Sequence, residues 1–264
     1  MRSKLLIGRT IDTGSWIHGL DPRAKLTAML VYTAAIIALR SWAALLLAAL
    51  FSLILMAATR IPYKYYAKAA KPLRLLMVFI FILQVLTVTQ GEVLLQTGLF
   101  SVSGGGLSAG GLAVLRMALF ISFTALLTFT TTPGRLNQGL DGMLKPFVRL
   151  KLPVRRLTLM AGLALRFIPA ILEESQRILK AQAARGADLR ELPLREKAKM
   201  LISLLVPITV GAFRRAEELV ISMEARGFVL DAPRTEYYEP SWGVRESGFV
   251  ALHILLLMVV LLLP

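Results

Sequence analysis

The sequence predicts an all-α, polytopic membrane protein with about five transmembrane helices and long amphipathic helices on the cytoplasmic side. Hydrophobic residues make up 56% of its 264 positions and the mean hydropathy is +0.66, whereas a soluble domain is roughly 45–50% apolar. Several charge-poor runs approach the length of about 20 residues that crosses a bilayer. The charge is also unusual, because 31 Lys and Arg face 16 Asp and Glu, a formal net charge of +15.

The first apolar run, Leu26–Ala58, holds 33 residues and one charge, Arg40. At 1.5 Å per residue it would make a helix of roughly 50 Å, which is too long for one upright crossing. We therefore expect a helical hairpin that turns at Arg40–Trp42, with Trp42 at the membrane interface; one long tilted helix is the alternative. Asp21 precedes this run, and we expect it to cap the first helix with Pro22 at the first helical position.

Three further runs predict the remaining spans, Leu73–Thr89, Gly111–Thr130 and Phe249–Pro264. We expect the glycine-rich stretch SVSGGGLSAGG, which precedes the second of these, to form a loop. Arg116 lies near one end of its span, where a long side chain can reach the headgroups.

Charge predicts the orientation of the spans. No Lys or Arg occurs between Glu92 and Gly106, whereas the N-terminus and the segment Arg60–Lys71 are basic. The positive-inside rule places both basic segments in the cytoplasm and the glycine-rich segment outside. We expect no signal peptide, because the N-terminal residues lack an apolar run followed by a cleavage site. Three parts follow: an N-terminal membrane part (1–130, about four spans), a cytoplasmic region (131–246) and a C-terminal span (247–264).

The cytoplasmic region holds 19 of the 31 basic residues, between Arg135 and Arg245. Basic and apolar residues alternate there at helical spacing. The pattern predicts two long helices or kinked helix pairs, Arg155–Ala184 and Leu194–Ala225, with Pro169 and Pro207 in their interiors. Acidic pairs precede the end of each helix, and we expect them to bind nearby basic side chains at helical spacing. These groups are Glu173, Glu174, Glu217 and Glu218 on one side and Arg177, Lys180, Arg214 and Arg215 on the other.

Catalytic and cofactor signals are missing from the sequence. The chain has no cysteine and no G-x-x-x-x-G-K-[ST] phosphate-binding loop. We expect its glycine cluster to lie in an extracellular loop, whereas a dinucleotide site needs glycines that follow a strand. His18 and His253 stand far apart outside any metal-binding pattern, so we expect structural or interfacial roles for them. The sequence therefore indicates no catalytic residue, no cofactor and no metal.

An Ala-Arg-Gly triplet follows each long predicted helix, at Ala184-Arg185-Gly186 and at Ala225-Arg226-Gly227, 41 positions apart. A single arginine there would be explained by the helix dipole or by lipid headgroups. Neither explanation requires small residues on both sides, however, and the repetition favours a specific role. Arginine binds a carboxylate through two hydrogen bonds, so two exposed copies suggest two similar acidic pockets on a dimeric partner.

These features resemble the transmembrane T component (EcfT/CbiQ-like) of energy-coupling factor (ECF) transporters, importers of vitamins and metal ions that are related to ABC transporters. The resemblance covers nearly the whole chain. It rests on LDPRAKL (20–26), FTTTPGRL (129–136), KPFVRLKLPVRRL (145–157), LALRFIPAILEE (163–174), AQAARGAD (181–188) and MEARGF (223–228).

The resemblance implies a non-catalytic scaffold in a prokaryotic cell (inner) membrane. Its two coupling helices would insert Arg185 and Arg226 into two cytoplasmic ABC-type ATPase subunits, and its apolar faces would contact a small substrate-binding membrane protein, the S component. The alanine-rich first hairpin, Ile168–Leu172 and Leu201–Val206 are the candidate contacts. ATP-driven motion of the ATPases would then reach the S component through these helices.

Three other functions remain as alternatives. A conventional ABC importer permease also binds ATPases, but it usually carries one coupling segment per chain. A membrane-embedded enzyme would need acidic or histidine clusters at membrane depth, and the spans hold almost no acids. A nucleic-acid binder would use the positive charge, but the basic residues alternate with apolar ones and no known nucleic-acid module is present.

Overall fold

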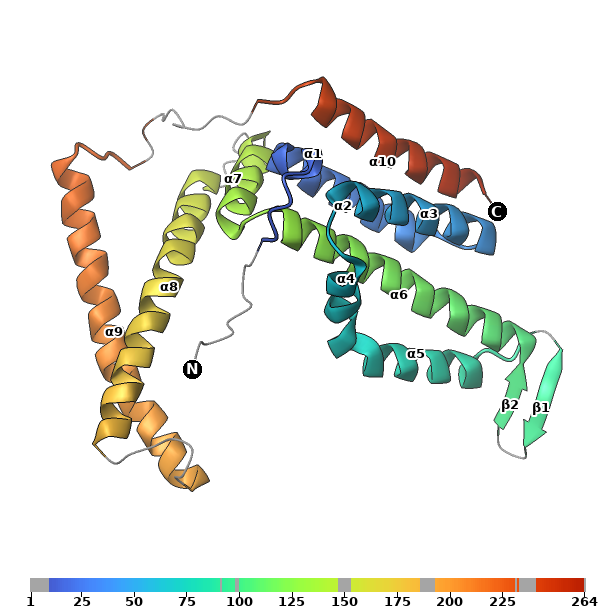
Figure 1. The fold of residues 1–264 in the computed structure, drawn as a ribbon, viewed down its shortest axis with the longest axis horizontal. Helices are drawn as coiled ribbons and strands as arrows, with labels where there is room; N and C mark the ends of the chain where they lie inside the picture. The colour runs from blue at the N-terminus through green and yellow to red at the C-terminus, as the bar shows by residue number, and fades with distance from the viewer. Residues whose placement is uncertain are drawn as a thin grey trace. The chain divides into compact units, whose positions relative to one another are not determined.

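The computed structural model describes residues 10–90, 92–97, 100–146, 153–185, 193–230, 232 and 241–263. The chain forms two compact units, one of Met1–Met143 with Glu239–Pro264 and the other of Leu144–Tyr238. Figure 1 shows that helices dominate both, which confirms the all-α prediction. The helices are α1 (Trp16–Gly19), α2 (Pro22–Ala38), α3 (Trp42–Thr59), α4 (Tyr63–Ala70), the 3-10 turn η1 (Lys71–Leu73), α5 (Arg74–Thr87), α6 (Gly104–Thr130), α7 (Pro133–Leu144), α8 (Val154–Ala184), α9 (Leu194–Ala225) and α10 (Val244–Leu262).

Within the described residues, four helical segments are long and apolar enough to cross a membrane: Trp42–Thr59, Tyr63–Thr87, Gly104–Thr130 and Val244–Leu262. Helix α2, with 17 residues, stands at the lower limit of about 17–25 residues for a span. Large apolar side chains are exposed along these segments, for example Leu75 at 83% and Phe79 at 58%. An exposed apolar surface of this kind suits a lipid environment.

The expected hairpin between the first two spans is present. Helix α2 ends at Ala38 and α3 begins at Trp42, where the Ser41 side chain caps the helix by accepting from the amide of Ala44 at 3.3 Å. The Arg116 guanidinium donates a hydrogen bond to the Leu39 carbonyl at the end of α2, so it is held by the hairpin turn. The predicted cap at the start of α2 is confirmed as well, because Asp21 accepts from the amide of Arg23 at 2.8 Å and Pro22 is the first helical residue.

The glycine-rich stretch is a correction, because most of it is helical. Helix α6 already begins at Gly104, and the Ser103 side chain caps it by accepting from the Gly106 amide at 3.0 Å. The glycines permit close contact with the chain that follows α5: a Cβ atom at Gly105 would lie 2.0 Å from the Gln90 carbonyl oxygen. A tertiary contact of this kind leaves no periodic signal in the sequence.

A short antiparallel hairpin precedes α6 and was not expected either. Strand β1 (Val93–Thr97) pairs with β2 (Phe100–Ser103), with Gln96 opposite Ser101 and a register irregularity between Val93 and Leu95. Val, Thr and Phe favour strands, but the segments are too short for a reliable prediction.

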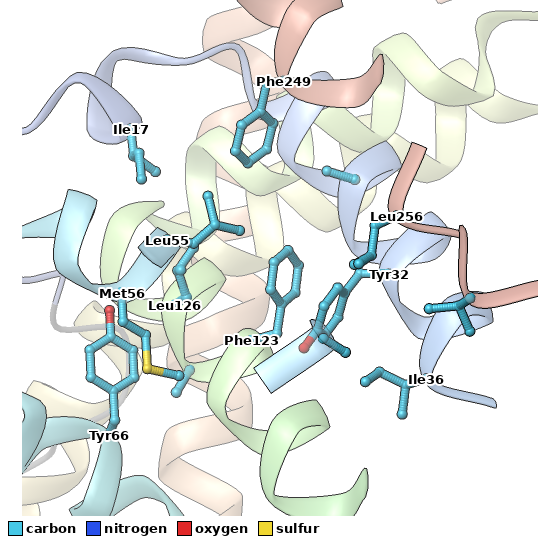
Figure 2. Packing of buried hydrophobic residues seen from close by; sticks show 14 of the residues in the cluster. Ile17, Tyr32, Ile36, Leu55, Met56, Tyr66, Phe123, Leu126, Phe249 and Leu256 are labelled. Carbon is cyan, nitrogen blue, oxygen red and sulfur yellow. The ribbon is translucent and has the colours of Figure 1, made fainter. Parts of the chain in front are cut away.

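The core of the first unit surrounds Tyr32 of α2 (Figure 2). Its ring stacks on Phe123 of α6 with the centroids 4.2 Å apart, and its hydroxyl bonds to Ser52 of α3. His253 of α10 is fully buried beside it, and its Nδ1 bonds to the Phe249 carbonyl at 2.8 Å. This histidine therefore packs in the core.

A buried lysine joins the LDPRAKL and FTTTPGRL segments. Lys25 of α2 is 3% exposed, and its Nζ donates to the Thr130 carbonyl and to the Thr131 hydroxyl, both at 3.1 Å, and to the His18 carbonyl at 3.3 Å. The Thr130 carbonyl belongs to the last turn of α6, where unpaired carbonyls favour a cation. Two segments more than 100 residues apart in the chain thus meet at one ammonium group.

The second unit is built from α8 and α9, the two long helices that the sequence predicts. Their bounds, Val154–Ala184 and Leu194–Ala225, differ from the expected ranges by one residue at most. Pro169 and Pro207 lie inside helices that continue past them. Figure 1 shows the two helices crossing one another.

Candidate functional site

The first candidate arginine stands at the end of α8. Ala184 is the last helical residue, and Arg185 follows as the cap with its backbone amide donating to the Gln182 carbonyl at 3.0 Å. Both residues are exposed. Gly186, the third member of the triplet, lies outside the described residues.

The second triplet ends α9 in a hydrogen-bonded C-terminal motif. Phe228 donates its amide to the Met223 carbonyl at 3.0 Å, and Gly227 donates to the Glu224 carbonyl at 2.9 Å. These two bonds define a Schellman motif, which needs a left-handed residue just after the cap, and Gly227 has φ +72°. Arg226 therefore occupies the cap, and the chain turns away from the helix directly after it.

The two arginines share one structural position. Each is the cap residue after a helix of 31 or 32 residues, each follows an alanine, and each side chain is exposed. No ion pair or side-chain hydrogen bond joins either guanidinium to another residue in the part of the chain that the structure describes. An exposed planar cation flanked by small residues can enter a pocket and bind a carboxylate through two hydrogen bonds.

The helices also meet through charge, at a place that the sequence reasoning missed. Arg215 of α9 forms an ion pair with Glu174 of α8, so this carboxylate binds across the helices, where we expected pairing at helical spacing. Gly211 makes room for it, because a Cβ atom there would lie 2.9 Å from the nearer Glu174 carboxylate oxygen. A signal for this contact was available: Glu174 and Arg215 are 41 positions apart, the same offset as the two triplets.

The histidine close to the N-terminal end, His18, has a structural role. His18 bonds to the Ser15 hydroxyl at 2.6 Å and to the Ile11 carbonyl at 2.8 Å, so both of its ring nitrogens are used near the start of the described chain. Among the described residues, no group of three or more His, Asp or Glu side chains could hold a metal ion.

The fold and these helix ends define the class of protein: a multi-pass helical membrane protein with a helical pair that displays two equivalent arginines. Comparisons with known proteins identify the family. The family model described as the cobalt transport protein CbiQ matches residues 13–237. The energy-coupling factor transporter transmembrane protein EcfT of Bacillus subtilis (strain 168) is 38% identical over 256 residues, which cover 97% of each chain.

Other relatives give the same result. EcfT of Listeria innocua serovar 6a is 38% identical over 247 residues, covering 94% of this chain and 93% of its own. EcfT of Streptococcus equi subsp. equi is 38% identical over 253 residues, covering 96% and 94%. The chain belongs to the EcfT/CbiQ family, the transmembrane components of ECF transporters. It is a multi-pass membrane protein of bacteria and a non-catalytic subunit of its transporter.

Proposed function

We propose that this chain is the coupling scaffold of an ECF-type importer for vitamins or other micronutrients, and that Arg185 and Arg226 dock two cytoplasmic ABC-type ATPase subunits. The observation that carries the proposal is the equivalence of the two arginines: both are exposed caps that end long helices, 41 positions apart. Two equivalent projections suit a partner with two equivalent sockets. Ala184, Gly186, Ala225 and Gly227 complete the docking site because their small size leaves the guanidinium groups accessible.

The proposed topology places both helix ends on the ATPase side. The N-terminus and the segment Arg60–Lys71 lie in the cytoplasm, and the charge-poor segment Glu92–Gly106 lies outside. The density of basic residues in each segment supports this orientation through the positive-inside rule. Residues 131–246 then form the cytoplasmic coupling region between membrane parts at 1–130 and 247–264.

In the proposed mechanism this chain transmits motion and carries out no chemistry. ATP binding would move the two ATPase subunits relative to each other, and each arginine would carry its helix end along. A helix of about 30 residues is roughly 45 Å long, so α8 and α9 act as stiff levers. Their displacement would change how the S component is held and release its substrate inside the cell.

Apolar side chains on the levers are available for the S component. Leu201, Ile202, Leu205 and Val206 on α9 are 51–66% exposed. On α8, Ile168 is 45% exposed. A contact of this kind would bury apolar area and leave the substrate choice to the S component, and the alanine-rich first hairpin remains a further candidate.

The experiment that tests the proposal is co-purification of the ATPases with tagged variants of this chain. We expect Arg185→Ala and Arg226→Ala each to weaken ATPase binding by about 2–5 kcal/mol, because a buried partner carboxylate would lose its cation. Arg185→Lys and Arg226→Lys should bind the ATPases almost as weakly as the alanine variants, because lysine lacks the planar guanidinium group that forms two parallel hydrogen bonds. Arg166→Ala, an exposed arginine in the middle of α8, is the matched control.

Two readouts complete this experiment, the amount of bound ATPase and substrate uptake into vesicles. The proposal predicts that uptake falls together with ATPase binding, and that the double variant loses both. Normal binding and normal uptake in the double variant would refute the role of the two arginines.

A further inference from the structure

The ion pair between Glu174 and Arg215 joins α8 and α9 where the two helices contact each other. Glu174 lies eleven positions before Arg185, and Arg215 lies eleven positions before Arg226. The two charged residues therefore occupy the same place in the two helices, measured from the docking arginines.

Burial follows the same offset. Every buried or half-buried position of α9 from Met200 to Met223 has a counterpart 41 positions earlier, in α8, that is also buried or half-buried. Leu163 with Leu204 and Ile178 with Leu219 are examples. The two helices therefore use the same face in their packing.

A residue touches its own counterpart only where two equivalent elements cross on a local two-fold axis. The contact between Glu174 and Arg215 places that axis at their ion pair. From this point each helix continues for eleven residues, about 16 Å at 1.5 Å per residue, to its arginine. The two arms are thus equal in length.

The residues at the crossing are of types that can fix the register of α8 against α9. Two identical charged side chains on such an axis would repel each other, whereas Glu and Arg attract. Small residues stand one turn earlier on both helices, Gly211 against the Glu174 carboxylate and Ala170 at the equivalent position of α8. The Glu174 and Arg215 side chains are 28% and 35% exposed, and partly exposed pairs stabilise a fold only weakly. A polar contact between helices can fix their register even where it adds little stability.

We propose that Glu174 and Arg215 form the pivot of the two coupling helices: their ion pair fixes the register of α8 against α9 and thereby the spacing of Arg185 and Arg226. The consequence for ATPase docking rests on the function proposed above. The spacing itself is a property of this chain alone and can be measured without any partner.

The test is a distance measurement between spin labels in the purified full-length chain in lipid nanodiscs. The chain contains no cysteine, so cysteines at Ala183 and Glu224, equivalent exposed positions near the two ends, would carry the only labels. We expect one narrow distance distribution. Glu174→Arg and Arg215→Glu should each broaden it or shift its mean by about 5 Å, the rise of one helical turn.

The double variant Glu174→Arg/Arg215→Glu decides between positioning and simple packing. Because small residues, Gly211 and Ala170, stand one turn earlier on both helices, we expect the swapped pair to restore the original distribution. Glu173→Arg and Arg214→Glu, which make the same charge changes at adjacent exposed positions, should leave it unchanged. Should a charge reversal prevent folding, Glu174→Gln and Arg215→Gln remove the pair with little change in shape and should broaden the distribution in the same way.

An unchanged distribution in the single and neutral variants would overturn the pivot, and so would a double variant as broad as the single ones. These results are separable from the docking experiment. If the Arg185 and Arg226 variants lose ATPase binding while substitutions of Glu174 and Arg215 leave the label distance unchanged, the pivot proposal is wrong and the docking proposal is supported. If substitutions of Glu174 and Arg215 change the label distance but the chain binds no ATPase, the pivot proposal is supported and the docking proposal is wrong.

Discussion

At the scale of single residues, the exposed arginines at the helix ends and the buried lysine of α2 need different surroundings. Arg185 and Arg226 are exposed and can meet a planar carboxylate on a partner. Lys25 is buried and needs only oxygen acceptors, which it finds in two carbonyl groups and a hydroxyl group. In the function proposed above, the two arginines would serve an interaction between chains, whereas Lys25 serves the fold of the first unit.

Replacement of Lys25 tests the structural role. Lys25→Met keeps the length of the side chain and removes the ammonium group, which leaves the buried Thr131 hydroxyl and the carbonyl at the end of α6 without this donor. Because hydrogen bonds to charged groups contribute about 1.5–3 kcal/mol each, we expect the free energy of unfolding to fall by about 2–3 kcal/mol after the apolar gain. Thermal unfolding in detergent measures the change.

Lys64→Met is the control for this prediction, because Lys64 is exposed and should tolerate the same substitution. Equal unfolding midpoints for the Lys25→Met variant and the unaltered protein would show that the buried ammonium group contributes nothing to the stability of the first unit.

At the scale of elements, the end of α9 depends on a backbone conformation that glycine adopts freely. Gly227 has φ +72° and open space around its missing side chain, so a substitution there acts through the backbone alone. We expect Gly227→Ala to destabilise the last turn by about 1 kcal/mol, and Gly227→Asn to cost less, because asparagine tolerates the left-handed region. Hydrogen exchange of the amides of Gly227 and Phe228 measures the effect.

In this experiment the amides before the last turn of α9 serve as the internal reference. Slower or unchanged exchange in Gly227→Ala would contradict the requirement for a left-handed residue at this position.

The elements differ in how far the sequence predicts them. Charge and apolar periodicity were sufficient for α8 and α9 because long helices average over many residues. The start of α6 at Gly104 was not predictable, since it depends on the Ser103 cap and on contact with Gln90. At the candidate site, the triplets were visible as a repeat. The ion pair between Glu174 and Arg215 could not be predicted without knowing where the two helices cross, although the offset of 41 positions pointed to it.

At the scale of the whole molecule, the candidate membrane spans and the candidate docking arginines belong to different units of the chain. The four candidate spans found among the described residues all lie in the first unit, whereas the second unit holds both candidate docking arginines. The members of this family are membrane subunits without catalytic function, and such a subunit can still determine where its partners bind. In the proposed function, two equivalent arginines on helix segments of equal length would dock a partner that is itself two-fold symmetric.

Site-specific photocrosslinking in the assembled transporter tests the docking of the two helix ends most directly. A photoreactive residue would replace Ala184 or Ala225, each beside its arginine, with Met160 near the start of α8 as the control position. We predict that both alanine positions crosslink to a soluble ATP-hydrolysing subunit and that Met160 does not. Crosslinks from Ala184 and Ala225 only to lipid or to a membrane partner would contradict the docking of two ATPases by Arg185 and Arg226.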